Sequence, residues 1–263
     1  MKFNLLNQDP GFISGKQLDQ LSSGEHKFIG LDNSQRLEIC LRNSPKDWYY
    51  RTHEVKYILN SNKFRTKEFK DIDWENSIVL IGCSNTFGIG VTEEDTIAAN
   101  LQEITGKYVV NLGSPGVCNS VIAYNSYYLK ENYPEPLAVV HLWTAMTRYF
   151  VMTESFHMKN LLNDTENTNS MVTPVIYNIM FMKMINALWK NHPNYIQTCA
   201  NDIEAENDKY TTRFKYSITR KLFPEALYVE DCFWSDVNAR DSGHPGRKAT
   251  KKLAKIIASN LKL

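Results

Sequence analysis

Three short apolar runs, each followed by small polar residues, constrain the fold of this chain more than any other feature. They are SIVLIG from Ser77, KYVVNLG from Lys107 and LAVVHLW from Leu137. Runs that are apolar at successive positions, rather than at alternate ones, indicate strands that are buried on both faces. Helical segments separate the runs, so the sequence predicts an α/β fold with a short parallel sheet and right-handed crossovers.

The segments between these runs have helical spacing. TEEDTIAANLQEITG places three apolar residues on one helical face: Ile97, Leu101 and Ile104. Thr92, with Asp95 three residues later, is the expected N-cap, and Gly106 is the expected end of this helix. CNSVIAYNSYYLKEN, closed by Pro134, predicts the next helix.

Two more strands and two more helices are expected beyond residue 150. TPVIYNIMFMKMINALWKN predicts a helix with this buried face: Ile176, Met180, Met184 and Leu188. YIQTCA and ALYVED predict the fourth and fifth strands. The last helix carries lysines on a solvated face and this apolar stripe: Leu253, Ile256, Ile257 and Leu261.

Residues 1–76 differ from the rest, because they are polar and rich in turns. EVKYILNSNKFRTKEF predicts two short strands around the turn Asn60-Ser61-Asn62. We interpret 1–76 as an N-terminal extension packed on a main domain of residues 77–263.

Charge and composition exclude several classes of function. A formal net charge of +1 argues against a nucleic-acid or membrane-surface partner. No apolar run approaches the ~20 residues of a membrane span, and MKFNLLNQDPGF lacks the apolar stretch of a signal peptide. The five cysteines are widely spaced, which is typical of free thiols in a reducing compartment. The sequence therefore predicts a cytoplasmic protein.

Small polar clusters follow the predicted strands: GCSNTFG, GSPGVCN and TAMTR, with DSGHPG before the last helix. In an open α/β sheet, ligands bind outside the carboxyl ends of the strands. The four loops are therefore expected to converge on one rim.

A phosphate cradle does not fit the first of these loops. Gly82 and Gly88 have the wrong spacing for a P-loop, and no lysine follows Gly88. Gly88 and Gly90 lack the third glycine of a dinucleotide fingerprint.

A serine nucleophile fits better. A serine hydroxyl needs a base, usually a histidine that a carboxylate orients. His244 lies in DSGHPG, and Asp241 three residues earlier can reach its Nδ1 across a tight turn. Asp241 also suits a cap of the last helix. Ser84 alone fits a turn or capping serine, but Asp241 and His244 favour the nucleophile over that interpretation and over the adjacent Cys83.

Ser84 in GCSNTFG, the glycine loop NLGSPGVCN and the terminal DSGHPG together resemble the SGNH, or GDSL-type, serine hydrolases. The resemblance covers about residues 77–263, and D-x-x-H-P is its most specific part. It implies a three-layer α/β/α sandwich of the flavodoxin-like kind. It also implies that Ser84 is the nucleophile, His244 the base and Asp241 the residue that orients this base.

The same resemblance implies an oxyanion hole. The Ser84 N–H and the Gly116 N–H match two of its donors, and Gly113 matches the structural turn before Gly116. The family's third-block asparagine is missing, because the third strand ends HLWTAMTRYF. Thr144, Asn119 and Arg148 are alternatives for this place, and Arg148 fits an anion-binding or a carboxylate-pairing role equally.

We expect a serine ester hydrolase that removes short acyl groups, such as acetyl, from a carbohydrate or another small ester. It is expected to use no metal and no cofactor, and the residues show no metal-ligand spacing. His141, inside an apolar strand, is expected to be a core histidine with one hydrogen-bond partner. The alternatives are a non-catalytic glycan-binding or structural module with a degenerate oxyanion hole, and a flavodoxin-like cofactor binder.

Overall fold

A five-stranded parallel sheet forms the centre of the computed structural model, which describes residues 11–146, 148–151, 157–160, 172–199, 223–229 and 239–263. Its strands are β3 (Ile78–Gly82), β4 (Val109–Gly113), β5 (Ala138–Trp143), β8 (Tyr195–Cys199) and β9 (Leu227–Tyr228). Their order is β4-β3-β5-β8-β9, and every neighbouring pair is parallel. The predicted strands and the parallel sheet are confirmed.

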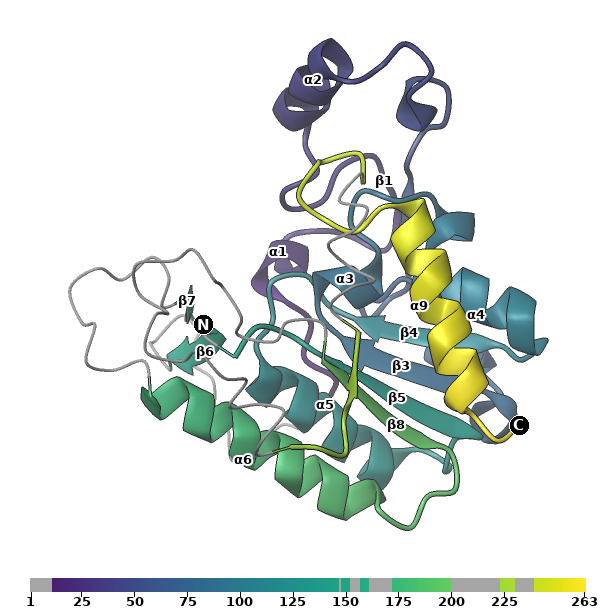
Figure 1. The fold of residues 1–263 in the computed structure, drawn as a ribbon, viewed down its shortest axis with the longest axis vertical. Helices are drawn as coiled ribbons and strands as arrows, with labels where there is room; N and C mark the ends of the chain where they lie inside the picture. The colour runs from purple at the N-terminus through teal and green to yellow at the C-terminus, as the bar shows by residue number, and fades with distance from the viewer. Residues whose placement is uncertain (1–10, 147, 152–156, 161–171, 200–222, 230–238) are drawn as a thin grey trace.

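Helices cover both faces of this sheet, which gives the expected three layers (Figure 1). α4 (Ile97–Thr105) and α9 (Arg247–Asn260) lie on one face, and α5 (Asn119–Asn132) and α6 (Val172–Trp189) lie on the other. Successive residues of β3 point to opposite faces, so Leu80 packs with Leu253 of α9, whereas Ile81 packs with Ile122 of α5. Helices bury both faces of β3 and β5, which explains why these strands do not alternate between apolar and polar residues.

Helix α4 begins later than the sequence predicts. Its N-cap is Thr96, whose Oγ1 accepts a hydrogen bond of 3.0 Å from Ala99 N, and not Thr92. The Thr92 hydroxyl donates to Asp95 Oδ2 over 3.0 Å instead, within a short 3₁₀ turn. Gly106 ends the helix in the left-handed conformation, as expected.

The predicted buried face of α6 is wrong. Met180 and Met184 are 52% and 61% exposed, and Ile176 is exposed as well. The buried residues are Ile179, Met182, Ile185 and Trp189, and Leu188 is partly buried beside them. The helix is apolar around most of its circumference, so periodicity alone does not distinguish the face that packs on α5.

Residues 11–76 form small elements, of which those up to Leu59 lie toward the carboxyl end of the sheet, whereas the 3₁₀ turns Phe69–Asp71 and Trp74–Asn76 lead to the start of β3. The α-helices and strands up to Leu59 are α1 (Lys16–Asp19), β1 (Gly24–His26), α2 (Ser34–Asn43) and β2 (Tyr57–Leu59). The predicted second strand after Asn60 does not form, because β2 pairs antiparallel with β1, more than thirty positions earlier, rather than with residues 63–69. The turn itself is present, since Asn60 N donates to Phe64 O over 2.9 Å.

Two further features complete the described residues. β6 (Arg148–Val151) and β7 (His157–Asn160) form an antiparallel pair that the sequence did not predict. None of the helices in the described ranges is long and apolar enough to cross a bilayer. Cys40, Cys83, Cys118 and Cys199 are free thiols, and Cys232 lies outside the described residues.

Candidate active site

A sharp turn after β3 presents Ser84. Cys83 is the N-cap of the one-turn helix α3 (Ser84–Phe87), which ends at Gly88 with φ +83°. Backbone hydrogen bonds of 3.0 Å close this turn, from Phe87 N to Cys83 O and from Gly88 N to Ser84 O. β3 lies between β4 and β5, where the strand order reverses, which is the usual ligand position in an open α/β sheet.

Gly113 lets this turn rest on the end of β4. A Cβ at Gly113 would lie 2.2 Å from Phe87 N and 2.6 Å from Thr86 C, both backbone atoms. Any side chain here would therefore displace α3, which matches the structural role that the resemblance assigned to Gly113.

The loop before α9 carries the other two predicted residues, and we call residues 239–244 the acid–base loop. His244 Nε2 lies 3.0 Å from Ser84 Oγ, and His244 Nδ1 lies 2.6 Å from Asp241 Oδ2. The structure thus brings together the serine, imidazole and carboxylate over 160 positions of sequence. Gly243 N donates to Asp241 Oδ1 over 3.1 Å, so both carboxylate oxygens are engaged. Asp241 does not cap α9, whose N-cap is Gly246.

The surroundings keep Asp241 ionised. Burial raises the pKa of this carboxyl, but the hydrogen bond and charge of His244, the Gly243 N–H and the Arg36 guanidinium outweigh it and lower the pKa below its ordinary value. A carboxylate at Oδ2 favours the imidazole tautomer with its proton on Nδ1. Nε2 is then the acceptor that faces the Ser84 hydroxyl.

Gly116 lies in the loop after β4, beside the nucleophile turn. Gly82 and Gly113 are paired in the sheet, so the loops that start from them leave the same edge. Gly116 has φ +78°, in the left-handed region, and is half-buried. Within the described residues, neither its N–H nor that of Ser84 donates a hydrogen bond.

Asn119 and Thr144 hold one another. Asn119 Oδ1 accepts from Thr144 N over 2.8 Å, and Asn119 Nδ2 donates to Thr144 O over 3.1 Å. The amide of Asn119 therefore ties the start of α5 to the end of β5. Leu142 pairs with Gly82, and Thr144 and Ser84 each follow their member of this pair by two residues. Thr144 is buried at this rim.

Arg148 is at the start of β6 and is half-buried. Its main chain is held by Asn178, whose Nδ2 donates to Arg148 O over 3.0 Å. Its Nη1 is buried and has no hydrogen-bond acceptor among the described residues. The structure records no carboxylate partner for Arg148 within those residues.

Two neighbouring candidates, Cys83 and His141, differ from Ser84 in their contacts. Cys83 Sγ lies 4.0 Å from Ser84 Oγ, and it is Ser84 that contacts the imidazole. His141 is fully buried in β5, stacked on Trp143. The prediction that His141 has one hydrogen-bond partner is wrong, because neither ring nitrogen has one among the described residues.

Contacts from residues 11–76 are the part of the site that the sequence did not reveal. Arg36 Nη1 donates to Asp241 O over 3.3 Å, and the buried Arg240 pairs with Asp32. Nothing in ARDSGHPG shows that Arg240, directly before Asp241, is buried, so the sequence carried no signal for its pairing with Asp32.

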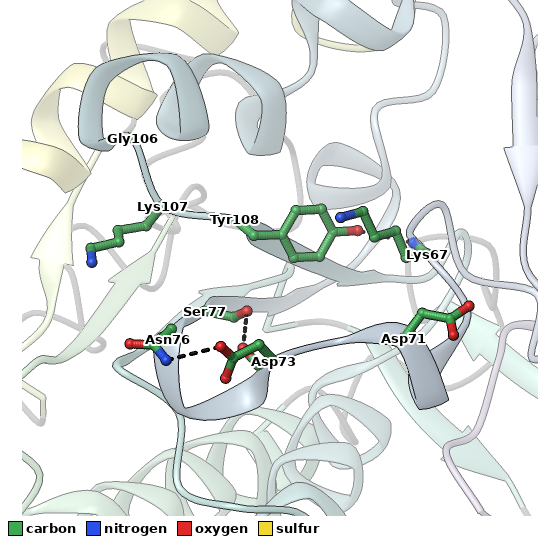
Figure 2. A pocket seen from close by; sticks show the side chains of 8 residues that line it. All are labelled: Lys67, Asp71, Asp73, Asn76, Ser77, Gly106, Lys107 and Tyr108. Atoms are coloured by element: carbon green, nitrogen blue, oxygen red, sulfur yellow. Dashed lines mark hydrogen bonds between the residues drawn. The ribbon is translucent and has the colours of Figure 1, made fainter.

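A different pocket, of about 360 Å³, lies at the opposite end of the sheet, where β3 and β4 begin (Figure 2). Its polar groups bind each other: Asn76 Nδ2 donates to Asp73 Oδ2 over 2.9 Å, and Lys67 Nζ lies 4.3 Å from the centre of the Tyr108 ring. It holds no pair of nucleophile and base. No group of three metal-ligating side chains occurs in the described part of the chain.

No family model and no curated protein matches this chain. Solved structures do. A putative lipolytic protein of the G-D-S-L family from Desulfitobacterium hafniense is 14% identical, with a TM-score of 0.44 over 71% of this chain and 100% of that one. AlinE4, an SGNH-hydrolase family esterase, is 12% identical, with a TM-score of 0.40 over 61% and 78%. Est2A, an acetyl xylan esterase from Butyrivibrio proteoclasticus, is 12% identical, with a TM-score of 0.42 over 72% and 63%. Solved structures similar to this chain are thus SGNH and GDSL-type hydrolases, the family that its three sequence blocks resemble.

Proposed function

We propose that this protein is a serine ester hydrolase. The observation that supports this most is the chain of hydrogen bonds from Ser84 Oγ through His244 to the ionised Asp241, at 3.0 and 2.6 Å. This is the arrangement that converts a weakly nucleophilic hydroxyl into an effective one.

The reaction follows from the positions of the protons. Ser84 Oγ attacks the ester carbonyl carbon while His244 Nε2 takes its proton, and the carbonyl electrons move to the oxygen. When the tetrahedral intermediate collapses, the bond to the alcohol oxygen breaks and Nε2–H protonates this leaving group. Water, deprotonated by Nε2, then attacks the acyl carbon. When this second intermediate collapses, the bond to Ser84 Oγ breaks, Nε2–H returns its proton to Oγ, and the carboxylic acid and free Ser84 are released. Asp241 orients the ring and stabilises the imidazolium in both steps.

In this proposal the backbone N–H groups of Ser84 and Gly116 stabilise the oxyanion. Loss of one such donor typically reduces the rate by ~10²–10³-fold. Asn119 braces Thr144, which directly follows β5, and Thr144 stays one of the alternatives for the place of the family's missing asparagine. Arg148, with Nη1 unpaired among the described residues, is proposed to bind an anionic group of the substrate.

The substrate class and domain division belong to the same proposal. The resemblance suggests short acyl groups, acetyl among them, on a carbohydrate or another small ester. Residues 77–263 would form the hydrolase domain and residues 1–76 an extension of it.

A fluorophosphonate probe, followed by peptide mapping, tests the nucleophile directly. We expect labelling at Ser84 alone, and Ser84→Ala should lose both the label and the hydrolysis of p-nitrophenyl acetate. Cys83→Ala is the matched control, because it changes the adjacent side chain and should retain both. A folded wild-type protein without label at Ser84 would refute the mechanism.

A non-catalytic glycan-binding module is the second candidate. The observation that favours it is that both ends of the Asn119 amide bind the main chain of Thr144, so Asn119 is not free to replace the asparagine that the third block lacks. The same labelling experiment separates the two functions, because a binding module predicts an unreactive Ser84.

A further inference from the structure

A closed ring of hydrogen bonds joins the nucleophile turn to the acid–base loop. Gly90, just beyond α3, accepts from Arg240 N over 2.7 Å. Gly90 N donates to Tyr57 Oη over 2.8 Å, and Tyr57 Oη donates to Asp32 Oδ2. Asp32 accepts from Arg240 Nε over 2.9 Å and from Arg240 Nη2 over 2.5 Å, which closes the ring. We call these four residues the Asp32 network.

The two charged residues of the Asp32 network are buried and opposite in charge. Asp32 is fully buried and Arg240 is 2% exposed, so each charge depends on the other. Burial, and then the charge of Asp32, raise the pKa of Tyr57 well above its ordinary value. Tyr57 therefore stays a neutral phenol that donates to Asp32 and accepts from Gly90.

Gly90 is the point where the two loops touch. It has φ +76°, and a Cβ there would lie 2.9 Å from Ala239 Cβ and 3.1 Å from Asp241 Oδ1. Arg240 is the residue directly before Asp241. The Asp32 network thus fixes the segment after the nucleophile turn against the acid–base loop, at Gly90, which follows α3, and at Arg240, which precedes Asp241.

The same N-terminal region holds the other loops of the rim. Arg65 Nη1 donates to Gly88 O over 2.8 Å, at the end of α3. Gly15 N donates to Ser114 Oγ over 2.5 Å, in the loop of Gly116. Residues 11–76 therefore contact all three sequence blocks of the site.

We propose that Asp32 and Tyr57 are positioning residues, which hold Ser84 and His244 at proton-transfer distance through Arg240 and Gly90. This inference rests on the proposed function. Neither residue touches the reacting atoms. Their effect is on the 3.0 Å separation of Ser84 Oγ and His244 Nε2, and a misplacement of about 1 Å in such a geometry can cost about 10²-fold in rate.

The test is steady-state hydrolysis of p-nitrophenyl acetate by Tyr57→Phe and Asp32→Asn. Tyr57→Phe removes one hydroxyl and keeps the ring, so it is the variant expected to fold. We expect kcat to fall about 10- to 100-fold with KM nearly unchanged, because positioning and not binding is lost. The double variant should lose little more than the worse single variant, since both changes break one ring.

Phe69→Leu is the matched control. Phe69 is a buried aromatic residue of the same region that packs against Phe12 and Trp74, away from the Asp32 network. It should lower thermal stability and leave kcat unchanged. Folded network variants with wild-type kcat would overturn the inference.

Hydrogen exchange gives a reading that does not depend on catalysis. The amide protons of Gly90 and Arg240 should lose protection in Tyr57→Phe but not in Phe69→Leu. Unchanged protection would overturn the inference even if the wild-type enzyme were inert. Inertness with no label at Ser84 would refute the proposed function instead.

Discussion

Stability toward acid should depend strongly on His141, a residue remote from the proposed chemistry. Its ring is fully buried in β5, 5.3 Å from the Trp143 ring and 5.5 Å from the Tyr195 ring, centre to centre. Burial lowers the pKa of His141 from 6.5 to about 3. No described side chain offers the ring a counter-charge that would favour protonation.

The direction of this pH effect on stability follows from the number of protons that the folded and unfolded chains bind. Below pH 6.5 the unfolded chain binds a proton at this histidine and the folded chain does not, so unfolding becomes more favourable as the pH falls. The contribution is complete above the unfolded pKa of 6.5 and is lost toward the folded pKa of about 3. Between neutral pH and about pH 5, this amounts to about 2 kcal/mol of unfolding free energy, at ~1.4 kcal/mol for each unit.

Denaturant unfolding of wild type and His141→Leu at several pH values measures this contribution. The leucine side chain cannot titrate and leaves no polar atom unpaired. We expect the variant to gain about 2 kcal/mol relative to wild type between pH 7 and about pH 5, whatever its stability at pH 7. A difference between the two proteins that stays constant over this range would refute the reasoning.

The remaining predictions concern the site and its scaffold. Asp241→Asn should lower kcat by about 10⁴-fold, because an amide does not hold the imidazole in the required tautomer, and a loss under tenfold would contradict the assigned role. The lowered pKa of Asp241 also means that its stabilising effect is complete above the ordinary carboxyl value of ~4 and is lost as the pH falls through the folded pKa; acid titration of the variant should lack this loss. Gly113→Ala should destabilise the fold by about 1–3 kcal/mol or more, since its Cβ would meet the backbone of α3. Gly106→Asn, at a left-handed position with no atom within 4 Å, should cost much less in the same denaturant titration.

The sheet, and the order of the proposed catalytic residues Ser84, Asp241 and His244 along the chain, could be predicted from the sequence because short local patterns encode both. A strand buried on two faces is apolar at successive positions, as in β3, and the loops after parallel strands lie at the same end of the sheet. The Asp241–His244 contact spans one tight turn, so the three-residue spacing of the two side chains predicts it. The tertiary structure was needed to bring Ser84 within 3.0 Å of His244.

Other features depend on contacts between distant residues and had no local signal. α6 is apolar on several sides, and only packing against α5 selected Ile179 and Met182 over Met180 and Met184. The strand predicted after Asn60 failed because β2 found its partner in β1.

By itself, the sequence determined a three-layer α/β fold with a serine turn and an Asp–x–x–His loop at the carboxyl ends of its strands. Only the tertiary structure decided which contacts residues 11–76 make with these loops. Asp32 and Arg240 are 208 positions apart, and each looks like an ordinary surface charge in the sequence. Folding removes both from water, and a buried charge is stable only beside its partner, so their pairing is a property of the assembled core.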